Sequence, residues 1–167
     1  MKGAMLIWIG LACVLGGAGW GVWTNERILA DGRVVLLELA PMDPRSLMQG
    51  DFMALNYALN SALSQKRARE DAYAIVRLDA RKVATLVRVQ PDLDSNTAPS
   101  VEEELAIHYR VRNHRVQIAT NAFFFQEGHE PEFRSARYGE FRIGANGEPR
   151  LTALLDGDLK RLGENRY

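Results

Sequence analysis

Two carboxylates and an arginine are the side chains that we single out first for chemistry. Asp51 lies in the stretch MQGDFMALNY (residues 48–57), Arg45 shortly precedes that stretch, and Glu127 lies much further along the chain. Two neighbouring carboxyl groups act as an acid and a base only when their surroundings separate their pKa values. A hydrolase that uses Arg45, Asp51 and Glu127 is therefore one hypothesis for the function.

Asp51 also has a simpler, geometric interpretation. Gly50 permits a backbone bend that other residues resist, and an aspartate in such a place commonly hydrogen-bonds to the backbone of its own turn. In this interpretation Asp51 caps the bend, and Leu55 and Tyr57 carry the following strand into the core. The sequence favours this structural role over acid–base chemistry.

The three histidines lack the spacing of a metal site. His108 falls on the outward face of an expected strand, His114 falls in a turn, and His129 stands beside a glutamate without an HExxH pattern. We interpret all three as structural. The sequence therefore predicts neither a metal nor another cofactor.

The charge balance excludes one class of partner. Lysine plus arginine and aspartate plus glutamate number 21 each, so the chain has no overall basic field for nucleic acid. Its one basic cluster, residues 66–69, is followed at once by two acidic residues, which is typical of a solvated helix face. We expect no nucleic-acid partner, and the sequence leaves any small-molecule ligand open.

An uncharged apolar run, Ala4–Trp23, lies near the start of the chain. A helix of about 20 residues crosses the roughly 30 Å hydrocarbon core of a bilayer, and Trp20 and Trp23 suit the interface. The run is longer than the apolar core of a cleaved signal peptide, and tryptophans occupy the place of the small residues that cleavage needs. We expect an uncleaved transmembrane signal anchor, with cleavage as the alternative.

One face of this expected helix carries small side chains. Cys13, Gly17 and Gly21 recur every four residues and so lie on one side, where another helix can approach closely. Glycine is also common in membrane helices, so an anchor without a docking role is the alternative. Basic residues flank the run on both sides and give almost no positive-inside bias; the short tail before it favours an extracytoplasmic C-terminal domain.

Short segments of alternating polarity predict an all-β domain after the anchor. About eight short strands with turns between them are typical of a sandwich or a partly open barrel. Met53, Leu55, Tyr57 and Leu59 share the expected core face of one strand. The expected strands are residues 34–40, 52–59, 73–78, 83–89, 105–112, 115–121, 123–125, 138–143 and 151–155, with a short helix or structured loop over 61–71.

The sequence resembles the GDYXXLXY protein family. The matching residues are Gly50, Asp51, Phe52, Leu55 and Tyr57, with Phe52 in place of the first tyrosine of the signature. The flanking stretches DPR (43–45), FFQEG (124–128) and YGEFR (138–142) agree, and the resemblance covers about residues 34–156. It implies a bacterial, membrane-anchored protein of the cell envelope and a companion of multi-pass membrane proteins. It implies no reaction.

A second, partial resemblance tests for an enzyme. The stretch SLMQGD (46–51) is similar to part of the signal peptidase signature, but the serine nucleophile of that pattern falls on Met42 and its proline on Arg45. Methionine has no hydroxyl group, so that nucleophile is absent. Lys82, the candidate base, falls in an expected hairpin turn. A distant signal-peptidase-like fold without the nucleophile is thus a further alternative.

These patterns divide the chain into four parts. They are a transmembrane signal anchor (1–23), a polar juxtamembrane helix or linker (24–33), a GDYXXLXY-like β domain (34–156) and a C-terminal tail (157–167). We expect a single-pass inner-membrane protein with its domain outside the cytoplasm. Its expected role is interaction with, or scaffolding of, an integral-membrane partner rather than catalysis.

Overall fold

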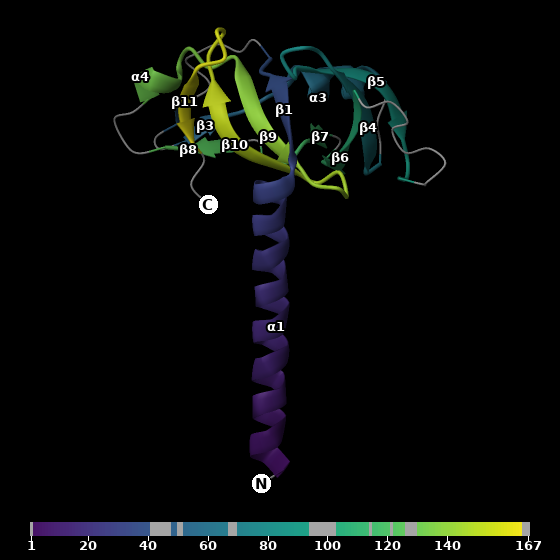
Figure 1. Cartoon of the computed structure of the whole chain (residues 1–167), viewed down its shortest axis with the longest axis vertical. Helices are drawn as coiled ribbons and strands as arrows, with labels where there is room; N and C mark the ends of the chain where they lie inside the picture. The colour runs from purple at the N-terminus through teal and green to yellow at the C-terminus, as the bar shows by residue number, and fades with distance from the viewer. Residues whose placement is uncertain are drawn as a thin grey trace.

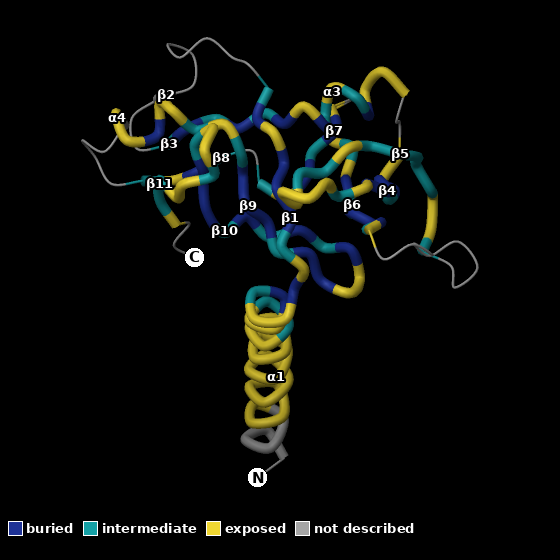
Figure 2. Tube along the Cα trace, turned by 45° about the horizontal axis from the view of Figure 1, so that its top comes forward, coloured by how far each residue is buried: buried dark blue, intermediate teal, exposed yellow. Residues whose placement is uncertain are grey.

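A long helix carries a β domain at its C-terminal end in the computed structural model (Figure 1). Residues 2–40, 48–49, 52–66, 70–93, 103–113, 115–120, 122–125 and 130–164 are described. The helix, α1, covers Lys2–Asp31, and every residue from 7 to 23 is exposed (Figure 2). Over Ile7–Asp31 it is long and apolar enough to cross a membrane.

The described strands of the domain form three antiparallel sheets. Their strand orders are β1-β9-β10-β11, β2-β3-β8 and β5-β4-β6-β7. Within the described ranges none of the three sheets closes into a barrel. The strands are β1 (Arg33–Glu38), β2 (Met48–Gln49), β3 (Phe52–Ala54), β4 (Ala72–Leu78), β5 (Ala84–Gln90), β6 (Glu104–Arg112), β7 (Arg115–Gln117), β8 (Ala122–Phe124), β9 (Tyr138–Ile143), β10 (Pro149–Leu155) and β11 (Arg161–Glu164), and the short helices are α3 (Ala58–Gln65) and α4 (Glu130–Phe133).

Strand β1 connects the two larger sheets. It pairs with β9 along its whole length, and its Leu36 N–H donates to the carbonyl oxygen of Lys82, just before β5, at 2.9 Å. The turn between β9 and β10 makes a second connection, because the N–H of His108 on β6 donates to the Gly147 carbonyl oxygen at 2.8 Å. The two sheets therefore enclose one apolar core.

The predicted core face of the motif region is confirmed. Tyr57 is fully buried, and Met53, Leu55 and Leu59 are no more than 6% exposed. The secondary structure that carries them differs from the expected single strand over 52–59. Strand β3 ends at Ala54, Tyr57 forms only an isolated bridge with Leu39, and α3 begins at Ala58.

The earlier start of α3 has a clear physical cause. Its sequence, ALNSALSQ, is rich in the strong helix formers alanine and leucine. Leu59 and Leu63 are four residues apart and are the buried residues of this helix, so a helical period buries both of them on one face. A strand through the same residues would also place Leu59 and Leu63 on one face. The helix propensity of the segment decides between helix and strand.

Two other segments differ from the expected strands. Strand β7 ends at Gln117 rather than at residue 121, because Ala119 has a left-handed φ of 52°, which a strand does not accommodate. The segment expected as a C-terminal tail contains β11, which pairs with β10. There Gly163 lies so close to Phe133 that an added Cβ would be 2.6 Å from its ring, a tertiary contact that alternation cannot reveal. The β4–β5 hairpin, with Lys82 in its turn, is confirmed.

The last turn of α1 attaches the helix to the domain. Ile28 is only 7% exposed, and its carbonyl oxygen accepts a hydrogen bond from Gly32 N–H at 3.0 Å. The Arg142 guanidinium donates to the Gly32 carbonyl oxygen at 3.1 Å. The helix thus becomes buried only where it enters the domain (Figure 2), and these contacts set its direction.

Candidate functional site

The predicted polar site cannot be placed in this fold. Arg45, Asp51 and Glu127 lie outside the described residues, and so does Gly50 of the motif. The carboxylate pair and the turn-capping role of Asp51 therefore stay predictions. The same holds for the segment with Met42, on which the comparison with signal peptidases depended.

The described motif residues are structural. Phe52 on β3 is half-buried, and its ring lies 6.1 Å from that of Phe124 between centroids. Leu55 is buried in the core. The Tyr57 ring packs edge-on against Phe141, with 5.3 Å between centroids, and its hydroxyl donates to the Thr120 carbonyl oxygen at 3.2 Å. The motif thus fixes the loop that contains Thr120.

The small-residue face of α1 is uncovered. Cys13, Gly17 and Gly21 are all exposed. A Cβ atom built on Gly17 or Gly21 would meet no atom of the described chain within 4 Å, apart from the helix's own backbone and neighbours. The described part of the domain therefore does not use this face.

A polar cavity of about 350 Å³ opens beside the end of α1, and we call it the arginine cavity. Strands β6, β7 and β10, the loop after β7 and the turn before β10 form its walls. Three guanidinium groups, a histidine and a glutamate provide its charged and titratable lining. The lining residues are His108, Arg110, Arg112, Gln117, Ala119, Thr120, Glu148, Pro149, Arg150 and Leu151.

Glu148 is at the centre of the ionic contacts in the arginine cavity. Its Oε1 accepts hydrogen bonds from His108 Nδ1 at 2.8 Å and from the Arg110 guanidinium at 3.1 Å, and its Oε2 lies 3.6 Å from Arg150 Nη1. Partial burial raises the pKa of Glu148, but the hydrogen bond from His108 and the charge of Arg110 outweigh burial, so the net pKa is lowered. Glu148 is therefore an anion at neutral pH.

A second carboxylate holds Arg112 at the rim. Both oxygens of Asp71 accept from Arg112 Nη1 at 3.3 Å, and Asp71 also accepts from the Val111 N–H at 2.7 Å. The hydrogen bond from Val111 is the largest cause that lowers the pKa of Asp71, and the charge of Arg112 adds to it. Both Asp71 and Arg112 are exposed to solvent.

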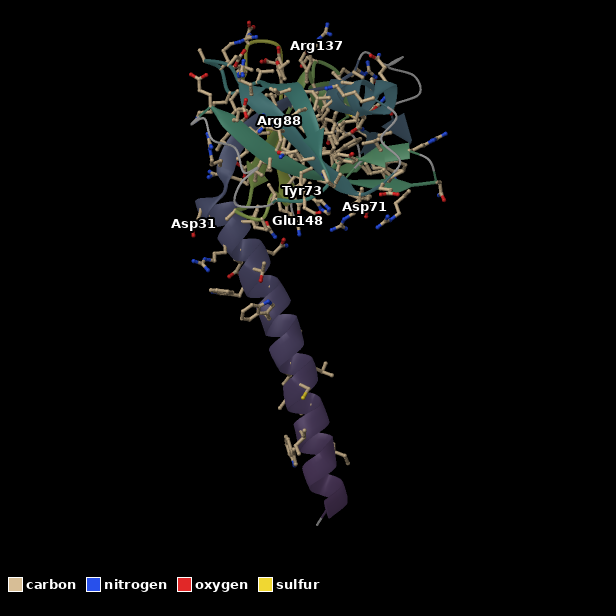
Figure 3. The ribbon with its side chains drawn as sticks, turned by 90° about the vertical axis from the view of Figure 1, so that its right-hand side faces the viewer. Asp31, Asp71, Tyr73, Arg88, Arg137 and Glu148 are labelled. Atoms are coloured by element: carbon tan, nitrogen blue, oxygen red, sulfur yellow. The ribbon has the colours of Figure 1, made fainter. Side chains whose placement is uncertain are left out.

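The arginine cavity lies on the side of the domain from which α1 projects. Arg150 Nε donates to Asn25 Oδ1 of the helix at 2.6 Å, which fixes one wall of the cavity to α1. Figure 3 shows Asp71, Tyr73 and Glu148 along this same side, whereas Arg137 lies on the opposite side of the domain. The Tyr73 ring also packs on His108, with 5.0 Å between centroids.

This arrangement suits the binding of an anion. The Thr120 hydroxyl, which lines the cavity, is already hydrogen-bonded to the backbone of Ala122. Among the described residues, no three His, Cys, Asp or Glu side chains gather as a metal site would require. Three guanidinium groups around one cavity, however, are typical of carboxylate or phosphate recognition.

The sequence interpretation missed the arginine cavity. It placed His108 on an outward strand face and did not single out Arg110, Arg112, Glu148 or Arg150. A signal was present, because residues 108, 110 and 112 are successive positions on one face of β6 and all three are basic or titratable. The contacts of this face with Glu148, in the turn between β9 and β10, are long-range contacts that the local pattern did not reveal.

A comparison with protein families agrees with the motif. The family described as GDYXXLXY protein matches residues 14–154, which is most of the chain and includes part of α1. No curated protein and no solved structure matches the chain.

Proposed function

Because the chain belongs to the GDYXXLXY family, we propose that it is a membrane-anchored cell-envelope protein that interacts with an integral-membrane partner and has no catalytic role. The single observation that supports this proposal is the uncovered helix α1. None of the window that could span a membrane is buried by the rest of the described chain. The domain is also attached to α1 by contacts at its last turn, so a partner bound to the helix would meet the domain in a fixed position.

The face with Cys13, Gly17 and Gly21 is the proposed contact surface within the membrane. Helices in lipid associate by close packing, and small residues let their backbones approach. On α1 this face has open space around it. The partner in this proposal is a multi-pass membrane protein, as the family resemblance implies. A second copy of this chain is the alternative partner and would pack against the same face.

We expect Gly17→Leu combined with Gly21→Leu to abolish most partner recovery while leaving the protein in the membrane. The two leucines keep the segment apolar but fill the contact face with bulk. The measurement is the amount of each integral-membrane protein that co-purifies with the full-length chain from native membranes, by quantitative mass spectrometry.

The matched control adds bulk to the other side of α1. Ala12 and Gly19 lie seven residues apart and so share a face, and Gly19 is about 200° around the helix from Gly17. Ala12→Leu combined with Gly19→Leu should leave partner recovery intact. If the Gly17 and Gly21 variant retained every membrane-embedded partner, the helix would serve only as an anchor.

The proposed location is the inner membrane, with a single pass and the β domain outside the cytoplasm. We expect an enzyme reporter fused after Tyr167 to be active outside the cytoplasm and to stay with the membrane after a high-salt wash. Activity inside the cytoplasm would reverse the orientation. A shortened chain in the soluble fraction would show instead that the N-terminal segment is cleaved.

A further inference from the structure

We propose that the arginine cavity binds the phosphodiester headgroup of an anionic phospholipid in the membrane leaflet next to the domain. This inference rests on the membrane anchorage of the proposed function. It goes beyond that function because it assigns a ligand class to a site on the β domain.

The first argument is the height of the cavity above the membrane. Trp20 and Trp23 are exposed aromatic side chains at the end of the apolar run, where the hydrocarbon meets the headgroups. Asn25 is two residues beyond Trp23, or about 3 Å along the helix axis. Since Arg150 is hydrogen-bonded to Asn25, its guanidinium lies at this level. The headgroup layer is roughly 5–7 Å thick on each side of a bilayer, so this cavity wall lies within it.

The second argument is the supply of unused donors. Arg110 and Arg112 each bind a carboxylate of the domain through one terminal nitrogen only, Nη2 and Nη1 respectively. Arg150 uses Nε and Nη1 for Asn25, Pro149 and Glu148. Each of these guanidiniums thus keeps at least one nitrogen without a partner in the described part of the chain. Planar guanidinium forks match phosphate oxygens well.

The third argument is charge. Around the cavity, the three guanidiniums face the two carboxylates Asp71 and Glu148, which leaves one net positive charge when His108 is neutral. A lipid phosphodiester carries one negative charge and would neutralise the site. A phosphomonoester, which carries more charge at neutral pH, would exceed it. The two carboxylates hold the guanidiniums in position and do not use all of their donors.

The test compares the full-length protein in nanodiscs of phosphatidylcholine with the same protein in discs that also contain phosphatidylglycerol. A ligand that binds only the folded state stabilises it, and we expect phosphatidylglycerol to raise the melting temperature of the β domain, followed by circular dichroism, by about 5 °C. Arg110→Gln combined with Arg112→Gln should reduce this rise to less than about 1 °C relative to its own phosphatidylcholine baseline. If the double variant does not fold, Arg112→Gln alone should lose at least half of the rise.

Three controls make the outcome decisive. Arg134→Gln combined with Arg137→Gln removes the same charge from exposed residues elsewhere on the domain. This variant should keep the full rise in melting temperature with phosphatidylglycerol. If it lost as much of the rise as the Arg110 and Arg112 variant, the arginine cavity would not be the binding site. Soluble glycerophosphoglycerol, the same phosphodiester without acyl chains, should give no rise when it is added to phosphatidylcholine discs. A rise equal to that from phosphatidylglycerol would overturn the lipid as the source. A wild-type melting temperature that does not depend on phosphatidylglycerol in disc-embedded protein would overturn this inference alone. Failure of the protein to enter the discs would instead overturn the anchorage.

Discussion

Leu55→Asp should unfold the β domain or leave it close to unfolded. Leu55 is 5% exposed and lies in the core cluster with Met53 and Tyr57. An unpaired carboxylate at this position costs several kcal/mol, which is a large part of a typical stability of about 5–15 kcal/mol. The measurement is chemical denaturation of the full-length protein in detergent, followed by the circular dichroism of its strands.

A matched substitution three residues later separates burial from charge. Ala58 is exposed and is the first residue of α3, whose first turn carries no acidic side chain. Ala58→Asp should therefore be neutral or slightly stabilising, because a negative charge near a helix N-terminus interacts favourably with the helix dipole. If both aspartate variants were equally stable, the burial of the motif face would be wrong.

The motif region shows how far local sequence patterns reach. Alternation correctly predicted that Leu55 and Tyr57 face the core, because a period of two is strongly constrained when one face is buried. The same alternation did not indicate that the strand stops at Ala54. Leu59 continues the apolar pattern in a helix as well as in a strand, and only the propensity of residues 58–65 distinguishes the two.

The arginine cavity lay beyond the reach of the sequence for a different reason. Its walls combine β6 with the start of β10, so Glu148 meets His108 and Arg110 across about 40 positions of the chain. The family motif contributes to this site indirectly. Tyr57 holds Thr120, and Thr120 lines the cavity. A motif that looks like a core signature thus also supports a surface site. Hydrogen bonds between residues so far apart along the chain can be predicted only when the order of the strands in the sheets is known.

The junction between α1 and the domain leads to the second large effect. We expect Gly32→Ala to destabilise the domain by about 1–3 kcal/mol and to loosen its attachment to the helix. An added Cβ atom would overlap the carbonyl oxygen of Ile28 and would lie 3.1 Å from both Arg142 Cβ and the Ile143 carbonyl oxygen. Two of these three neighbours are backbone atoms, which cannot move without disturbing α1 or β9.

Hydrogen exchange at residues 28–36, together with the melting temperature, measures this effect. Gly32→Ala should lower the melting temperature by several degrees and speed exchange at the junction. Gly157→Ala is the control, because among the described residues its Cβ would meet only Arg137 Cγ at 3.9 Å, an ordinary contact. A loosened junction would also release Arg150 from Asn25, so Gly32→Ala should reduce the stabilisation by phosphatidylglycerol although it touches no cavity residue. Unchanged exchange and an unchanged lipid response would mean that α1 and the domain move independently, and the arginine cavity would then have no fixed height above the membrane.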